Sequence, residues 1–172
     1  MRDILMTSLV ISFCAATAFA KEASDCFGRT YDLAHLKANP EQNARDIRAK
    51  LTTIEETGVS AIHMRILFRD DPREFTAYPA CYMEDGSCGI DCDGGHVKPE
   101  LMEDGRLRLT TGHLRAETFE TLPGDDDEGG CAGPVTRNIA DGPGYSDGMD
   151  KPTVFILYPR DSRECGWEDG DG

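Results

Sequence analysis

The sequence is poor in positive charge. Its 18 lysine and arginine residues stand against 32 aspartate and glutamate residues, so the formal net charge is −14. The excess lies late in the chain, because residues 21–74 carry nine basic and ten acidic residues, whereas residues 76–172 carry eight and twenty-one. An acidic surface repels phosphate backbones and anionic lipids. We therefore expect no nucleic-acid partner, while a small-molecule or protein partner stays open.

The chain also lacks an apolar run long enough to anchor it in a membrane. Residues 4–20 form its clearest apolar run, which four serine and threonine residues interrupt. A spanning helix needs about 20 predominantly apolar residues. The run ends in Ala18-Phe19-Ala20, a small-x-small cleavage signal, and charged Lys21 follows. We expect residues 1–20 to be a secretory signal peptide and the mature protein to be periplasmic or secreted, with no stable membrane association after cleavage.

The cysteines agree with export. Cys14 lies in the predicted leader, and the even set that remains is Cys26, Cys81, Cys88, Cys92, Cys131 and Cys165. Six cysteines in an exported chain predict a disulfide framework. A four-residue loop over residues 83–86, with Gly86 at a positive φ, would place Cys81 opposite Cys88. For the others we take Cys92 with Cys131 and Cys26 with Cys165, one of fifteen connectivities.

Apolar side chains alternate with polar ones in two segments, which is typical of strands with one wet face. The segments are residues 61–68 and 101–111, and Asp85-Gly86 and Asp104-Gly105 are turn dipeptides between such runs. The apolar run at 153–158 predicts a central strand buried on both faces, and residues 75–83 and 113–119 are weaker strand candidates.

We predict a single mainly β domain over residues 21–165. It is an antiparallel barrel or sandwich stapled by disulfides, with at most one short helix. Residues 124–130 and 141–150 are rich in glycine and aspartate and predict long acidic loops. We expect residues 166–172 to form a disordered acidic tail.

Residues 39–57 have two interpretations. The start Asn39-Pro40-Glu41-Gln42 resembles a helix N-terminus, and apolar residues then follow at three- and four-residue spacing. Ile47, Ala49 and Leu51 also alternate with polar residues, as in a strand. Local rules slightly favour the helix.

Two stretches resemble a group of uncharacterised exported bacterial proteins. They are Cys26-Phe-Gly-Arg-Thr-Tyr-Asp-Leu-Ala-His-Leu and Asp91-Cys92-Asp93-Gly94-Gly95. The resemblance implies a mainly β chain with a strand after the Asn39-Pro40 segment. It implies no activity.

One candidate for catalysis is the pentapeptide Gly144-Tyr145-Ser146-Asp147-Gly148, which has the letters of a nucleophile elbow. That motif requires a preceding strand and a following helix. Here the flanking residues are rich in glycine and proline, so we interpret the segment as a loop and Ser146 as non-catalytic. The sequence also carries no phosphate loop, dinucleotide fingerprint or haem-attachment motif.

The weak metal candidates are Asp85, Asp91, Asp93 and His96. Carboxylates at this density suit Ca²⁺, although the pattern fits no EF-hand loop. Cys88, Cys92 and His96 resemble part of a zinc site, but cysteines in an oxidising compartment pair with one another instead. We therefore expect solvated loops and no cofactor, with Ca²⁺ as the alternative.

These patterns lead to two functional hypotheses. The first is an exported, non-enzymatic β-domain that binds a small ligand or a protein partner in the cell envelope through loops on a rigid scaffold. The alternative is a Ca²⁺-dependent binding or hydrolytic protein that uses the acidic loops.

Overall fold

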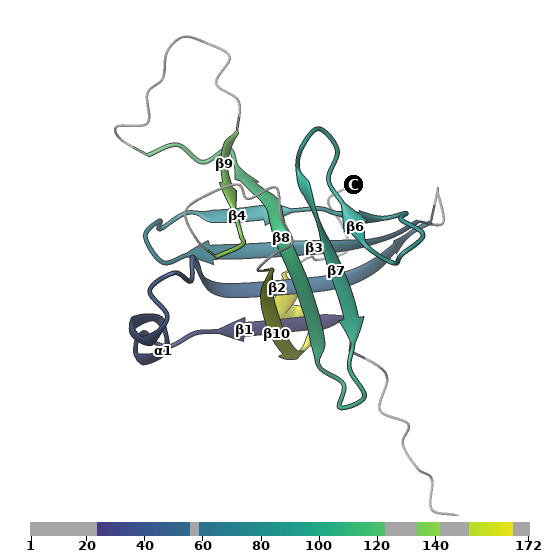
Figure 1. The fold of residues 1–172 in the computed structure, drawn as a ribbon, viewed down its shortest axis with the longest axis horizontal. Coiled ribbons are helices and arrows are strands. Elements are labelled where there is room, and N and C mark those ends of the chain that lie inside the picture. The colour runs from purple at the N-terminus through teal and green to yellow at the C-terminus, as the bar shows by residue number, and fades with distance from the viewer. Residues whose placement is uncertain (1–23, 56–58, 123–133, 142–151, 167–172) are drawn as a thin grey trace, which may run out of the picture.

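The structure, a computed structural model, describes residues 24–55, 59–122, 134–141 and 152–166. Within these ranges the chain forms ten strands, one short helix and one 3-10 turn (Figure 1). Their bounds are β1 (Cys26–Thr30), α1 (Leu33–Ala38), β2 (Ala44–Ile54), β3 (Val59–Phe68), β4 (Glu74–Ala77), β5 (Ala80–Cys81), β6 (Cys88–Gly89), β7 (Gly95–Leu101), β8 (Leu107–Thr118), β9 (Val135–Asn138), β10 (Thr153–Pro159) and η1 (Ser162–Cys165).

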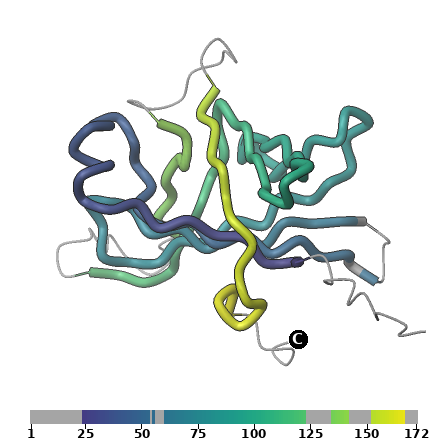
Figure 2. Tube along the Cα trace, turned by 90° about the horizontal axis from the view of Figure 1, so that it is seen from below, coloured from purple at the N-terminus to yellow at the C-terminus, as the bar shows by residue number. Residues whose placement is uncertain are grey.

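All described strands belong to one antiparallel sheet that curls round on itself. Its order is β10-β1-β2-β3-β4-β8-β7-β6-β5, with β9 attached to β8. Additional pairings of β10 with β8 and of β3 with β5 make the sheet ring-like. In Figure 2 the yellow β10 crosses β1 and leads into η1, which packs on β1 and β2. The mainly β fold with disulfides is confirmed.

The inner face of the ring carries the core. In β3, Ile62, Met64, Ile66 and Phe68 are buried, while the side chains between them are less so, as the alternation predicts. Burial of this kind is the main stabilising contribution, about 1.5–3 kcal/mol for each large apolar side chain. The largest fully buried side chains are Phe27, Phe68, Phe75, Phe155, Ile47, Ile62, Met64, Ile66, Leu107, Leu109, Leu114 and Ile139.

The ambiguous segment is strand β2. Ile47 and Ala49 are fully buried, whereas Arg48 and Lys50 lie on the outer face. β2 pairs with β3 from Ala44 to Ile54 and with β1 on its other side. Hydrogen-bonding partners on both edges satisfy the backbone, which outweighs the local helix signal.

Three strand predictions need correction. β10 is central but buried on one face only, because Val154 and Tyr158 lie on the exposed outer side of the ring. The segment 75–83 is divided into β4 and β5 near Pro79, whose ring nitrogen has no hydrogen to donate to a ladder. The segment 101–111 is the end of β7, a turn and the start of β8, with Gly105 at φ +79°.

Two elements were not predicted as such. Helix α1 begins after Asp32, whose carboxylate accepts a hydrogen bond from the backbone N–H of His35 at 2.7 Å. This is ordinary N-capping. Strand β7 buries Val97 and exposes Lys98 and Glu100, so it does show an alternating pattern. β7 pairs with β8 in antiparallel fashion and so extends the sheet beyond β8.

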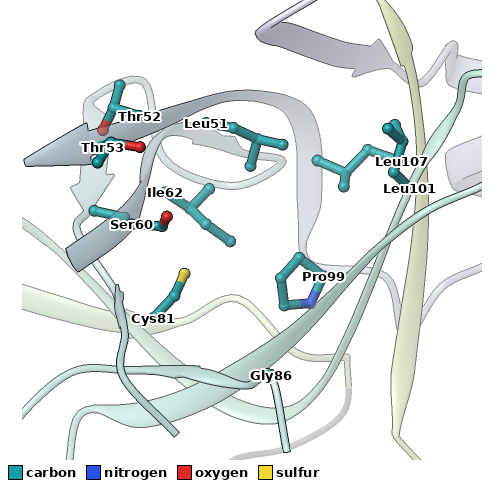
Figure 3. A pocket seen from close by; sticks show the side chains of 11 residues that line it. Leu51, Thr52, Thr53, Ser60, Ile62, Cys81, Gly86, Pro99, Leu101 and Leu107 are labelled. Atoms are coloured by element: carbon teal, nitrogen blue, oxygen red, sulfur yellow. The ribbon is translucent and has the colours of Figure 1, made fainter. Parts of the chain in front are cut away.

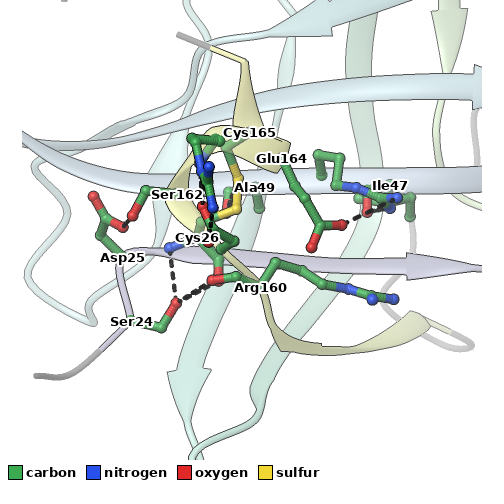
Figure 4. Close-up of a disulfide and its surroundings, with 12 residues drawn as sticks. Ser24, Asp25, Cys26, Ile47, Ala49, Arg160, Ser162, Glu164 and Cys165 are labelled. Carbon is green, nitrogen blue, oxygen red and sulfur yellow. Dashed lines mark hydrogen bonds and ion pairs between the residues drawn. A yellow bond between two sulfur atoms is a disulfide. The ribbon is translucent and has the colours of Figure 1, made fainter. Parts of the chain in front are cut away.

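Two disulfides lie within the described residues, and both were predicted. Cys26–Cys165 joins β1 to η1 across 139 residues, with Cα atoms 5.9 Å apart (Figure 4). Nearby, the Ser24 hydroxyl donates to the Cys26 carbonyl at 2.7 Å. Cys81–Cys88 closes the β5–β6 hairpin, in which Gly86 has φ +78° as expected.

Several predictions fall outside the described residues. They concern the leader at 1–20, the acidic residues 125–128, Cys131, Ser146 and the tail from residue 167. Cys92 is exposed and has no disulfide partner within the described ranges. Its pairing with Cys131 stays a prediction.

Candidate functional site

A cavity opens at one end of the ring-like sheet. Its volume is about 410 Å³, and it is open to solvent (Figure 3). The described residues that line it are Leu51, Thr52, Thr53, Ser60, Ala61, Ile62, Cys81, Gly86, Pro99, Leu101 and Leu107. We call this cavity the mouth pocket. Its size lies within the range of about 300–1,000 Å³ that is common for small-molecule sites.

Strand register places these side chains. Leu51 of β2 lies opposite Ile62 of β3. The next pair along this hairpin that faces the inside of the ring is Thr53 opposite Ser60. Leu101, the last residue of β7, is paired with Leu107, the first residue of β8. The pocket therefore forms where the inward-facing positions of two hairpins run past the filled core.

The pocket has apolar side chains at its base, and its rim is exposed to solvent. Ile62 and Leu107 are almost fully buried, whereas Leu101 at the rim is 59% exposed. Thr53 and Ser60 are also exposed, so their hydroxyls reach solvent. Among the described lining residues none is charged and none is a histidine. The described lining suits an uncharged, largely apolar group, and none of its described side chains is a general base or acid.

One wall of the pocket comes from the disulfide-closed hairpin over residues 81–88. Cys81 and Gly86 both line the cavity. The backbone N–H of Gly86 donates to the carbonyl of Met83 at 3.0 Å, which closes the turn. A covalent bridge and a hydrogen-bonded turn hold this wall in place against the edge of β3, with which β5 pairs.

The four metal candidates lie near this hairpin but serve other contacts. The Asp85 carboxylate accepts hydrogen bonds from the backbone N–H and the hydroxyl of Ser87, which lower the pKa of that carboxyl. The Asp91 carboxylate accepts a hydrogen bond from the Tyr82 hydroxyl at 3.3 Å, and its charge raises the pKa of that tyrosine. The backbone carbonyl oxygen of Asp93 lies within hydrogen-bonding distance, 3.1 Å, of Nε2 of His113.

His96 lies in β7 opposite His113. Within the described ranges, no three histidine, cysteine, aspartate or glutamate side chains come together as a metal-binding set. The four candidates are therefore close in sequence without forming a shared ligand sphere in the described part of the chain.

The residues of the mouth pocket were not predicted as a site. Leu51, Ile62 and Leu107 do stand out in the sequence, but as core positions of strands. Local patterning separates inward from outward side chains, yet it does not show where the core ends and a cavity begins. Pro99 carried no signal, because strand β7 was not recognised, and Leu101 was assigned to the predicted strand 101–111 and not to the end of β7.

Comparison with known proteins assigns neither a family nor a function to this chain. No family model, no curated protein and no solved structure matches this chain. The resemblance to exported bacterial proteins therefore stays a prediction. Among the described residues, no helix is both long and apolar enough to span a membrane.

Proposed function

We propose that this protein is an exported, non-enzymatic binding domain of the cell envelope and that its ligand occupies the mouth pocket. The observation that carries the proposal is a cavity of about 410 Å³ with an apolar base, located at the open end of the ring. Ligand sites are common at the mouths of β-barrels, and this sheet has a comparable shape.

The scaffold supports this role. Of the two disulfides in the described region, Cys81–Cys88 closes the hairpin that forms one wall of the pocket, and Cys26–Cys165 joins β1 to the turn after β10. A rigid frame lowers the conformational entropy that binding costs, so even a modest apolar contact area contributes to affinity. The ligand would displace water from Ile62, Leu51 and Leu107, which is favourable by about 25 cal/mol per Å² of apolar surface.

Export is part of the same proposal. Disulfides persist in oxidising compartments, and the pairings at Cys26–Cys165 and Cys81–Cys88 agree with that setting. We expect the protein recovered from its native host to begin at Lys21, as mass spectrometry of the intact chain would reveal. An intact leader on a cytoplasmic protein would contradict export without bearing on the pocket.

The binding proposal is tested with an uncharged naphthylamine dye whose fluorescence rises in apolar surroundings. We expect the oxidised mature protein to bind the dye with saturation. Leu101→Asp places a charge at the rim of the pocket, and we expect the affinity to fall at least about tenfold because the charge must be desolvated.

Leu33→Asp is the matched control. Leu33 is 75% exposed and lies in α1, outside the pocket lining. The same chemical change at this position should leave both dye binding and the melting temperature unchanged. Absence of saturable binding, or an equal loss in both variants, would overturn the mouth pocket as the site.

A further inference from the structure

We infer that the ligand of the mouth pocket is a neutral amphiphile, with an uncharged hydrogen-bonding head at Thr53 and Ser60 and an apolar tail along the base. This inference rests on the proposed function and adds the chemistry of the ligand. It follows from where the polar atoms of the lining lie and from the charges that surround the opening.

The polar groups of the lining gather on one side. Thr53 and Ser60 lie opposite each other in the β2–β3 register, both on the inward face of the ring and both exposed. Figure 3 shows them together at one end of the cavity, with Leu101 and Leu107 at the other end. Hydroxyls both donate and accept hydrogen bonds, so this pair can meet a hydroxyl, amide or ester group.

The rest of the lining is suited to a tail. Between the hydroxyl pair and Leu107 lie Leu51, Ile62 and Pro99, whose side chains carry no polar atoms. A polar group placed there would lose its hydration without gaining a hydrogen bond, which is unfavourable. The division into a polar end and an apolar remainder therefore sets the orientation of the ligand.

The charges around the pocket disfavour an anionic head. No basic side chain is among the described lining residues. The segments next to the lining residues in sequence carry the exposed acidic residues Glu55, Glu84 and Glu103. They also carry two basic residues, Lys98 and Arg106, of which Arg106 is paired with Asp104. A carboxylate would thus be desolvated without a counter-charge among the described lining residues, which is unfavourable.

A cationic head would also lack a direct partner, because the same lining holds no carboxylate. The acidic residues outside would attract it at a distance, but this attraction is screened over about 8 Å at physiological ionic strength. A cationic donor makes stronger hydrogen bonds to hydroxyl oxygens than a neutral donor does, but it also loses far more hydration free energy, which an uncharged lining does not replace. We therefore expect a neutral head group to bind more tightly than a cationic one.

The test compares three ligands with the same ten-carbon tail, namely decanol, decanoate and decylammonium. Each displaces the bound naphthylamine dye from the oxidised mature protein at neutral pH, below its micellar concentration. We expect decanol to bind at least about tenfold more tightly than decanoate, because the carboxylate must be desolvated. We also expect it to bind more tightly than decylammonium.

The double variant Thr53→Val with Ser60→Ala removes the two hydroxyls that face each other, keeps the neighbouring Thr52, and nearly preserves the shape of the lining. We expect it to weaken decanol binding about three- to tenfold, the usual effect of a lost neutral hydrogen bond, and to leave dye binding intact. Thr110→Val is the matched control, since Thr110 lies in β8 outside the lining and should have no effect.

The outcomes separate the two proposals. If the dye does not bind, the proposed function fails and this inference fails with it. If the dye binds but either charged ligand matches or exceeds decanol, the pocket is a binding site and the neutral-head inference is wrong. Unchanged decanol affinity in the double variant would also overturn the role of the hydroxyl pair.

Discussion

Cys26 and Cys165 are bonded to each other although 139 residues separate them, so one disulfide joins the first described strand to the last described turn. Both cysteines are fully buried. Because Cys26 lies in β1 and Cys165 follows β10, the bridge reinforces the β1–β10 pairing that helps to close the ring. The second disulfide closes a much shorter loop, with a sequence separation of 7.

We predict that the two disulfides differ in their contribution to stability. Cross-linking restricts the unfolded chain more when the loop is longer, so Cys26→Ala with Cys165→Ala should cost about 5 kcal/mol of unfolding free energy and Cys81→Ala with Cys88→Ala about 2 kcal/mol. Urea denaturation of both double variants measures the difference. A cost for the short loop that equals or exceeds the other would contradict this ranking.

A second prediction concerns Arg73 and Asp71, which form an almost fully buried ion pair. Their side chains are 7% and 10% exposed, and the N···O distance is 2.9 Å. Arg73 also donates to the carbonyl of Glu120 at 3.1 Å. Asp71→Asn should cost about 3 kcal/mol, because it removes a buried carboxylate that pairs with Arg73 and lies 3.7 Å from the Arg137 guanidinium.

The same pair contributes to acid sensitivity. Hydrogen bonds from Arg73 hold the pKa of the Asp71 carboxyl below its ordinary value. The stabilisation is therefore present above about pH 4, where unfolded aspartate is ionised, and is lost as the pH falls through the lower pKa of the folded state. Denaturation at several pH values should show a larger loss in the wild type than in Asp71→Asn, which keeps the other carboxylates with lowered pKa, such as Asp70. Asp104→Asn, at an exposed turn with Arg106, is the control and should change little.

A third prediction concerns His63 on the outer face of the ring. Desolvation by burial, and secondly the positive charge of Lys50, lower the pKa of this histidine. Since the folded state favours the neutral ring, His63 reduces stability as the pH falls below about 6.5.

We expect Lys50→Gln to raise the pKa of His63 without restoring its ordinary value, because desolvation is the larger cause. An NMR titration of the imidazole resonances measures the shift. Lys50→Arg keeps the charge and should leave the pKa nearly unchanged. A full return to the ordinary value in Lys50→Gln would show that the charge, not burial, dominates.

A fourth prediction addresses the alternative function, a dependence on divalent cations. A specific Ca²⁺ site would stabilise the folded protein by about 2.7 kcal/mol at a hundredfold excess over Kd. Because Asp85 and Asp91 already accept hydrogen bonds from Ser87 and Tyr82, we expect Ca²⁺ and Mg²⁺ at equal ionic strength to give the same melting temperature. A Ca²⁺-specific rise of several degrees, abolished by Asp91→Asn, would support the alternative instead.

Some structural features could be read from the sequence because they depend on neighbouring residues. The alternation in β3 is local, since successive side chains of a strand point to opposite faces. The Cys81–Cys88 hairpin is also local, since a four-residue loop with Gly86 at its end brings both cysteines together. The pairing of Cys26 with Cys165 was one choice among fifteen, and the sequence alone offered no physical reason to prefer it.

The choice between helix and strand at β2 shows where local reasoning ends. The spacing of its apolar residues satisfies both periods, so the decision depends on whether β1 and β3 lie on either side. The mouth pocket depends on tertiary structure still more strongly. Leu51 and Leu107 are ordinary inward-facing residues of separate strands, and they face a cavity because the ring stays open at that end.

The sequence by itself determined the mainly β class, the disulfide hairpin and the inward-facing positions of β3, because period-two patterning and turn chemistry act over a few residues. Only the tertiary structure decided the closure of the ring, the strand at β2 and the mouth pocket. These features arise from contacts between segments that are distant in sequence, such as β8 with β10, and the free energy of such contacts has no signature in any single stretch of residues.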